Sequence, residues 1–140
     1  MTAGTGVLHS EFSSPNENTH LLQIWILPER SGLSPSYEKK RFPRESKRGR
    51  LRLIASRDGE DGSITIHQDI KVFASVLNSG EVLFHTIPDH RHCWIQIIEG
   101  KLDVNGVALS AGDQAAISNE SEVRIVAEAD ETEFLLFDLK

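Results

Sequence analysis

The chain has 140 residues, of which 39% are hydrophobic, so it can build the core of one domain, and wholesale disorder is excluded. Its formal net charge of −6 argues against nucleic acid as a partner, because phosphate binding requires a cationic face. Cys93 is the only cysteine, which excludes an intrachain disulfide and a metal site built on cysteines.

The same features predict where the protein resides. A lone cysteine fits a reducing compartment, and the first twelve residues lack a charged region followed by an apolar one, as a secretory signal would have. No apolar run approaches the roughly 20 residues that a membrane span requires. We therefore expect a cytoplasmic protein without a membrane segment.

Apolar residues alternate with polar ones in short runs along nearly the whole chain, which predicts β-strands. In chain order these runs cover residues 22–26, 64–67, 82–87, 93–98, 123–126 and 133–139. Turn signals such as Asp58-Gly59, Asp61-Gly62 and Asn105-Gly106 separate several of them. Residues 68–77 show no clear helical period, so little helix is expected. Many short strands with hairpin turns indicate a sandwich or a closed barrel.

Residues 28–63 differ from the rest, because three prolines interrupt them and charge is dense. We interpret this stretch as a connector over the barrel surface. Its basic side chains are Lys39, Lys40, Arg41, Arg44, Lys47, Arg48, Arg50 and Arg52. They are either a solvated face balanced by acidic loops elsewhere or a patch for an anionic ligand or partner.

Histidines are the candidates for chemistry. His9 and Glu11 stand two residues apart in a predicted strand, so both side chains face one side and could share a divalent metal. His85 stands two residues from both Leu83 and Ile87, so it shares a strand face with these apolar side chains. Such a position is more typical of a core histidine than of a ligand. His90 and His92 fall in a predicted turn, and His20 and His67 have no clear partner.

Cys93 could in principle act as a nucleophile. It stands inside a strand pattern beside Trp94, however, and no activating base is evident in the sequence. The pattern therefore favours a small buried hydrophobic residue.

Several motifs together resemble the pirin family, and within it the bacterial pirin-like quercetinases. They include Ala3-Gly4-Thr5-Gly6 followed by His9-Ser10-Glu11, then Gln23–Pro28, Asp61–Ile64, Trp94–Ile97, Val104-Asn105-Gly106 and Leu135–Leu139. The resemblance covers essentially the whole chain. It implies a bicupin, with two β-barrels in a chain about twice this length, and a divalent metal in the N-terminal barrel.

In that family three histidines and one glutamate hold the metal. The resemblance places two of these ligands at His9 and Glu11, whereas the other two histidines belong to an HPH-type motif that this sequence lacks. We therefore expect a half site, which would hold Fe, Ni, Cu, Mn or Zn only if another chain completed it.

The resemblance also implies that the C-terminal barrel has no metal site. Counting back from Gly100, the glutamate of a metal-binding cupin barrel would fall near Cys93, and its histidines would fall near Thr86 and Pro88. His90 and His92 are displaced from these positions into the turn.

The predicted fold is thus all-β, a cupin-type barrel (a jelly roll, or double-stranded β-helix) with little helix. We divide the chain into remnant strands of the N-terminal cupin (1–27), a connector (28–63) and the C-terminal pirin-like cupin barrel (64–140), which together make one compact domain. Unpaired edges in the first segment predict a homodimer, with exchange of the N-terminal strands as one arrangement. A separately encoded N-terminal pirin half is the other candidate partner.

Three functions follow as hypotheses. The first is a pirin-like C-terminal cupin protein, related to quercetin 2,3-dioxygenase, without a complete metal site and not catalytic alone; a complementing chain would make it half of a split flavonol dioxygenase. The second is a protein-binding regulatory module. The third is a small-molecule binder with His85, Trp94 and Gln96 lining the barrel mouth.

Overall fold

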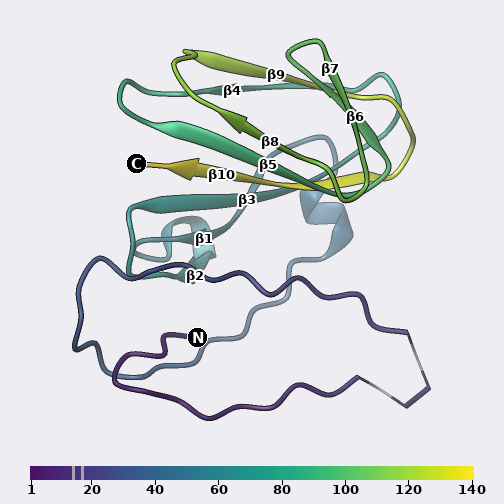
Figure 1. Ribbon diagram of the computed structural model, residues 1–140. Coiled ribbons are helices and arrows are strands. Elements are labelled where there is room, and N and C mark those ends of the chain that lie inside the picture. The colour runs from purple at the N-terminus through teal and green to yellow at the C-terminus, as the bar shows by residue number, and fades with distance from the viewer. Residues whose placement is uncertain (14, 17) are drawn as a thin grey trace.

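The computed structural model describes residues 1–13, 15–16 and 18–140. Within them, two packed sheets form a barrel from residue 52 onward, and a long irregular segment precedes it (Figure 1). The elements are η1 (Arg44–Lys47), β1 (Arg52–Ser56), η2 (Glu60–Gly62), β2 (Ile64–Thr65), β3 (Ile70–Leu77), β4 (Val82–Thr86), β5 (His92–Glu99), β6 (Lys101–Val104), β7 (Val107–Ser110), β8 (Gln114–Ile117), β9 (Glu122–Ala127) and β10 (Thr132–Leu139). The two helical elements are short 3-10 turns, so the all-β prediction is confirmed.

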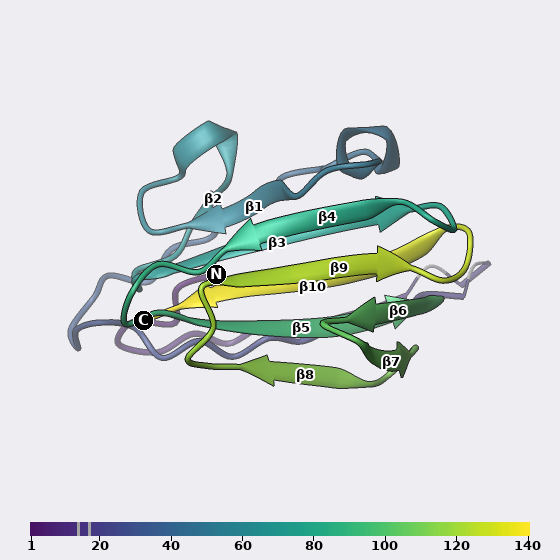
Figure 2. The same cartoon turned by 90° about the horizontal axis from the view of Figure 1, so that it is seen from above.

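One sheet has six strands in the order β2-β1-β3-β10-β5-β8, and the other has four in the order β4-β9-β6-β7. Figure 2 shows the smaller sheet lying across the larger one. The C-terminal strand β10 lies between β3 and β5 and runs antiparallel to both. This central place suits its nearly continuous apolar sequence, because a strand with neighbours on both sides and packing on both faces is deeply buried.

The core lies between the two sheets. Alternate side chains of β5, β9 and β10 point into it, and the largest fully buried ones include Ile95, Ile97, Ile125, Phe134 and Leu136. The period-two pattern separates the two faces of these strands, and the structure shows which of the two faces points inward. At the hairpin between β6 and β7, Asn105 and Gly106 both have positive φ angles (50° and 85°), as the Asn-Gly signal predicts.

Three differences from the predicted elements concern the first half of the chain. The strand predicted around His9 and Glu11 is wrong, because residues 6–13 have no β-pairing. The strand predicted over residues 22–26 is wrong: among the described residues before Arg44, the β-pairing is a single bridge between Thr2 and Ser36. An alternating pattern forms a strand only where a second backbone supplies hydrogen bonds, and here none lies alongside. Conversely, β1 forms inside the predicted connector and pairs with β3, which carried no strand prediction.

The part of the chain that the structure describes contains no helix long and apolar enough to cross a bilayer.

Candidate functional site

His9 and Glu11 lie close together on the irregular N-terminal segment. His9 Nε2 is 3.9 Å from Glu11 Oε1, and the two side chains are 42% and 54% exposed. They share one side of the chain, as the spacing of two residues predicts, although no neighbouring strand pairs with this stretch. An imidazole and a carboxylate are suitable ligands for a transition metal.

These two donors do not fit a metal by themselves. Across residues 1–13, 15–16 and 18–140, no group of three or more His, Cys, Asp or Glu side chains is arranged to hold a metal ion. Transition-metal sites in proteins are typically built from three or four protein ligands. The pair is therefore at most part of a site.

A second polar cluster lies inside one end of the barrel and was not predicted. Arg91, which precedes β5, contacts the carboxylate of Asp138 on β10 through Nε and lies 3.0 Å from Asp69. A second guanidinium nitrogen of Arg91 donates to the backbone carbonyl of Asp138 at 3.1 Å. On the facing sheet, His85 Nε2 lies 3.3 Å from the other oxygen of Asp138.

The cluster holds Asp138 in its charged form. Burial disfavours the carboxylate, but the contacts with His85 and Arg91 outweigh it, so the pKa of Asp138 lies below its ordinary value. The same carboxylate, together with Asp69, raises the pKa of Arg91 against the opposing effect of burial. Because the pKa of Asp138 is lowered in the folded protein, its charged form contributes stability at neutral pH and is poorly available as a base.

His85 is a core histidine, as its apolar phase suggested. Its ring packs against Phe73, with centroids 5.6 Å apart. Nε2 is buried without a well-formed hydrogen bond, because its contact with Asp138 lacks suitable direction.

Cys93 lies beside Asp138 in the β5–β10 register and is 2% exposed. Burial, with a smaller effect of Asp138, raises the pKa of its thiol to about 12. The thiol is therefore protonated at neutral pH and is a poor nucleophile and a poor metal ligand. Where a metal-binding cupin barrel would have its glutamate, this barrel has the buried thiol of Cys93.

Trp94 and Gln96 point away from the barrel interior, because they alternate with the buried Cys93, Ile95 and Ile97. Trp94 lines a cavity of about 620 Å³ outside the six-stranded sheet. Gln96 donates to backbone carbonyls of Gly112 and Asp113. The structure thus does not bring His85, Trp94 and Gln96 around one cavity.

The cavity beside Trp94 lies where the N-terminal segment crosses the sheet. Its apolar lining comes from residues 24–27 on one side and from Ile70, Trp94, Phe137 and Leu139 on the other. Gln68 Nε2 donates to Leu27 O at 2.9 Å, and Glu29 N donates to His67 O at 2.8 Å, which attaches the segment here.

The remaining histidines do not converge. His90 occupies the turn before β5 with a positive φ of 64°, and His92 begins β5 as an exposed residue. His20 is exposed on the N-terminal segment.

The basic segment divides into two parts. In and next to η1, Arg44, Lys47 and Arg48 form ion pairs with Glu131 and Glu133 at the start of β10, at distances of 2.5–2.9 Å. Hydrogen bonds from Arg48 and Arg44 lower the pKa of Glu131 to about 2. This part is balanced by acidic residues far along the chain, and it fastens the segment to the barrel.

The Asp138–Arg91 cluster was not predicted, although the sequence contains a signal for it. Asp138 shares the strand phase of Phe134 and Leu136, so a carboxylate stands in a run of core positions. Such a residue is almost never fully buried without a partner. The partner, Arg91, comes from a turn, where no periodicity could have placed it.

Comparisons with known proteins agree with this fold. The family model of the quercetinase C-terminal cupin domain matches residues 53–139. The chain is 43% identical over 140 residues to the quercetin 2,3-dioxygenase of Escherichia coli K12, covering 99% of this chain and 59% of that protein. It is 33% identical to a pirin-like protein of Caulobacter vibrioides, with 99% and 60% covered.

Solved structures give the same result. The crystal structure of YhhW from Escherichia coli has a TM-score of 0.77 at 39% identity and covers 83% of this chain and 48% of that one. Bacterial pirin YhhW in complex with nickel(II) has a TM-score of 0.76 at the same identity, with 82% and 48% covered.

The chain spans about three-fifths of the length of the curated relatives it matches. The domain match alone covers well over half of its residues, from the beginning of β1 to the end of β10. The chain therefore belongs to the pirin family and carries its quercetinase C-terminal cupin domain.

Proposed function

We propose that this chain supplies two ligands, His9 and Glu11, to a divalent-metal site of the quercetin 2,3-dioxygenase type, and that a second polypeptide supplies the others. The observation that carries the proposal is the pair itself, with an imidazole and a carboxylate 3.9 Å apart and open to solvent. On this proposal the chain alone is not catalytic, because two donors are too few to hold the metal in a defined geometry.

The surroundings of the pair support a missing partner. On the described part of residues 1–27, large apolar side chains are exposed, among them Leu8 (104%), Phe12 (89%), Trp25 (88%) and Leu27 (85%). Many exposed apolar groups along one segment are typical of an interaction surface, which supports the proposal that a further polypeptide covers it. The alternating pattern of the segment suits pairing with a strand of that chain.

The relatives support the identity of the partner. They are longer than this chain, and a pirin among them was crystallised in complex with nickel(II). A polypeptide corresponding to the region that this chain does not span would bring the further histidines. The bound metal would act as a Lewis acid toward a flavonol.

The test combines purified chain with a polypeptide containing that region, in the presence of Ni(II) or Fe(II). After gel filtration we expect retained metal by elemental analysis and consumption of quercetin, neither of which occurs with either chain alone. A His9→Ala/Glu11→Ala variant should still associate but lose both, whereas His20→Ala, which removes another exposed histidine, should keep both.

Failure of the mixture to take up metal would overturn the proposal, as would turnover by this chain alone. Light scattering on the isolated chain examines the other arrangement, a homodimer with exchanged N-terminal segments. A dimer that persists and excludes the second polypeptide would also count against the shared site.

A regulatory role through a protein partner is a weaker candidate. It depends on the basic segment, and ion pairs with Glu131 and Glu133 compensate the charges of Arg44, Lys47 and Arg48 within it. Pull-down with the remaining basic residues neutralised would separate this role from catalysis.

A further inference from the structure

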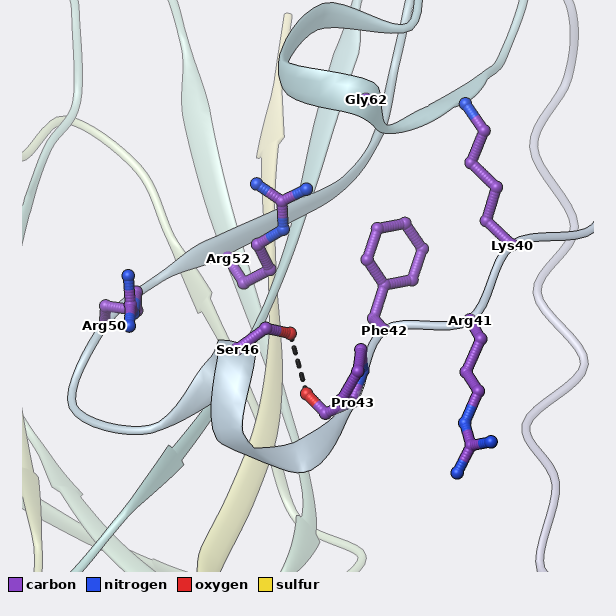
Figure 3. A pocket seen from close by; sticks show the side chains of 8 residues that line it. All are labelled: Lys40, Arg41, Phe42, Pro43, Ser46, Arg50, Arg52 and Gly62. Atoms are coloured by element: carbon purple, nitrogen blue, oxygen red, sulfur yellow. Dashed lines mark hydrogen bonds between the residues drawn. The ribbon is translucent and has the colours of Figure 1, made fainter.

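The other part of the basic segment, outside η1 and Arg48, surrounds a pocket. Its cavity of about 440 Å³ lies beside β1, and the lining residues are Lys40, Arg41, Phe42, Pro43, Ser46, Arg50, Arg52 and Gly62. Figure 3 shows the cationic side chains coming from two stretches, residues 40–41 before η1 and residues 50–52 at the beginning of β1. A cavity of this size suits a small molecule.

Three arginines at this pocket lack a carboxylate partner among the described residues. None of Arg41, Arg50 and Arg52 forms an ion pair with an acidic residue in the part of the chain that the structure describes. This contrasts with Arg44 and Arg48, a few residues away, which are paired with Glu131. In a chain of net charge −6, this pocket is a local concentration of uncompensated positive charge.

Two of the cationic side chains are held in place. The Arg52 guanidinium donates to Asp61 O at 2.8 Å and lies over the Phe42 ring, 5.6 Å from its centroid. Lys40 Nζ donates to Ser63 O at 2.6 Å and pairs with Glu38 at 2.7 Å. Arg52 bonds to the backbone carbonyl of Asp61 and not to its carboxylate, so the positive charge of Arg52 is not neutralised and stays available to a ligand. Because these side chains are already held in place, less conformational entropy is lost when a ligand binds and orders the site.

We infer that this pocket binds a small polyanion that carries at least two phosphate or carboxylate groups. Guanidinium groups match the planar geometry of carboxylate and phosphate oxygens and bind them through paired hydrogen bonds. Arg41 and Arg50 are exposed and free to fold onto such a ligand, while Arg52 supplies a preset contact. The site is independent of the metal ligands proposed above.

Isothermal titration calorimetry with inorganic pyrophosphate and, separately, with citrate tests the inference and distinguishes the two anion classes. We expect saturable binding of at least one probe that weakens as salt rises from 50 to 300 mM. Loss of each arginine contact should raise the Kd about tenfold, as for a hydrogen bond to a charged group. An Arg41→Gln/Arg50→Gln variant should therefore bind on the order of 100-fold more weakly.

The matched control is Arg30→Gln/Lys101→Gln, which removes the same net charge at exposed residues outside the pocket lining. Equal loss of affinity in the two variants would show a nonspecific charge effect and overturn the proposed site. If neither probe binds the unaltered protein, the proposed site is also overturned. On the unaltered protein, pyrophosphate or citrate should also slow phenylglyoxal modification of Arg41 and Arg50 but not of Arg30, measured by mass spectrometry. Equal modification with and without both anions would likewise refute the inference.

Discussion

Gly100 connects β5 to β6, where the chain passes from the six-stranded sheet to the four-stranded one. Its φ of +81° is a conformation that side chains rarely adopt, and a Cβ there would lie 2.3 Å from Thr132 Oγ1 and 2.8 Å from Thr132 Cα. Thr132 is fully buried, and its hydroxyl donates to Ala129 O at 2.7 Å, so it has little freedom to move.

We predict that Gly100→Ala lowers the free energy of unfolding by about 2–5 kcal/mol, from about 1–2 for the positive φ and about 1–3 for the steric overlap. Gly106→Ala is the control, because its φ is similar (+85°) and nothing lies within 4 Å of the added Cβ. Gly106→Ala should lower the free energy of unfolding only by the contribution of the positive φ, about 1–2 kcal/mol. Urea unfolding followed by fluorescence and circular dichroism measures both losses. Equal losses in the two variants would refute the claim that close packing on Thr132 requires glycine at position 100.

Three further outcomes follow from the described contacts. The Cys93 thiol, with a pKa of about 12 and 2% exposure, should resist iodoacetamide at pH 8 in the native protein and react rapidly in guanidinium chloride; rapid native alkylation would contradict its burial. Asp138→Asn should lower the free energy of unfolding by about 1.5–3 kcal/mol at pH 7, because Arg91 loses a charged acceptor. Since the pKa of Asp138 is lowered on folding, its contribution is full above the ordinary value of 3.8 and is lost as pH falls through the folded pKa. The variant should therefore lose less stability than the unaltered protein between pH 5 and pH 2, and parallel pH profiles would count against the pairing. Finally, NMR titration should place the pKa of Glu131 at about 2, and Arg48→Gln should move it toward 4.5; an unchanged value would exclude the ion pair as its cause.

The alternation of apolar and polar residues was sufficient to predict half of the barrel strands, namely β2, β4, β5, β9 and β10. Ile95 and Ile97 are buried and Trp94 faces outward, because a strand places successive side chains on opposite sides. The Asn105-Gly106 turn was also predicted, since Asn and Gly are the residues that most readily adopt the positive φ angles of a tight hairpin turn. The distance of 3.9 Å between His9 and Glu11 agrees with their spacing of two residues, whereas their role as metal ligands is what the family resemblance implies.

Other features depend on residues far apart in the sequence. Asp138 and Arg91 meet because β10 lies next to β5, and His85 reaches them from the opposite sheet. Likewise, the ion pairs of η1 with Glu131 and Glu133 separate the basic segment into a balanced part and the unpaired pocket, which charge counting along the chain could not do.

The amino-acid sequence by itself therefore determined the all-β class and the two alternating faces of the predicted strands, because each depends on a spacing of two residues or on a turn dipeptide. The tertiary structure alone decided which strands form and which charges remain free. A strand needs a second backbone to receive its hydrogen bonds, so residues 22–26 stay irregular while 52–56 join the sheet. A charged side chain is compensated only if the fold brings an oppositely charged group within a few ångströms of it. The local sequence around either residue does not reveal that proximity.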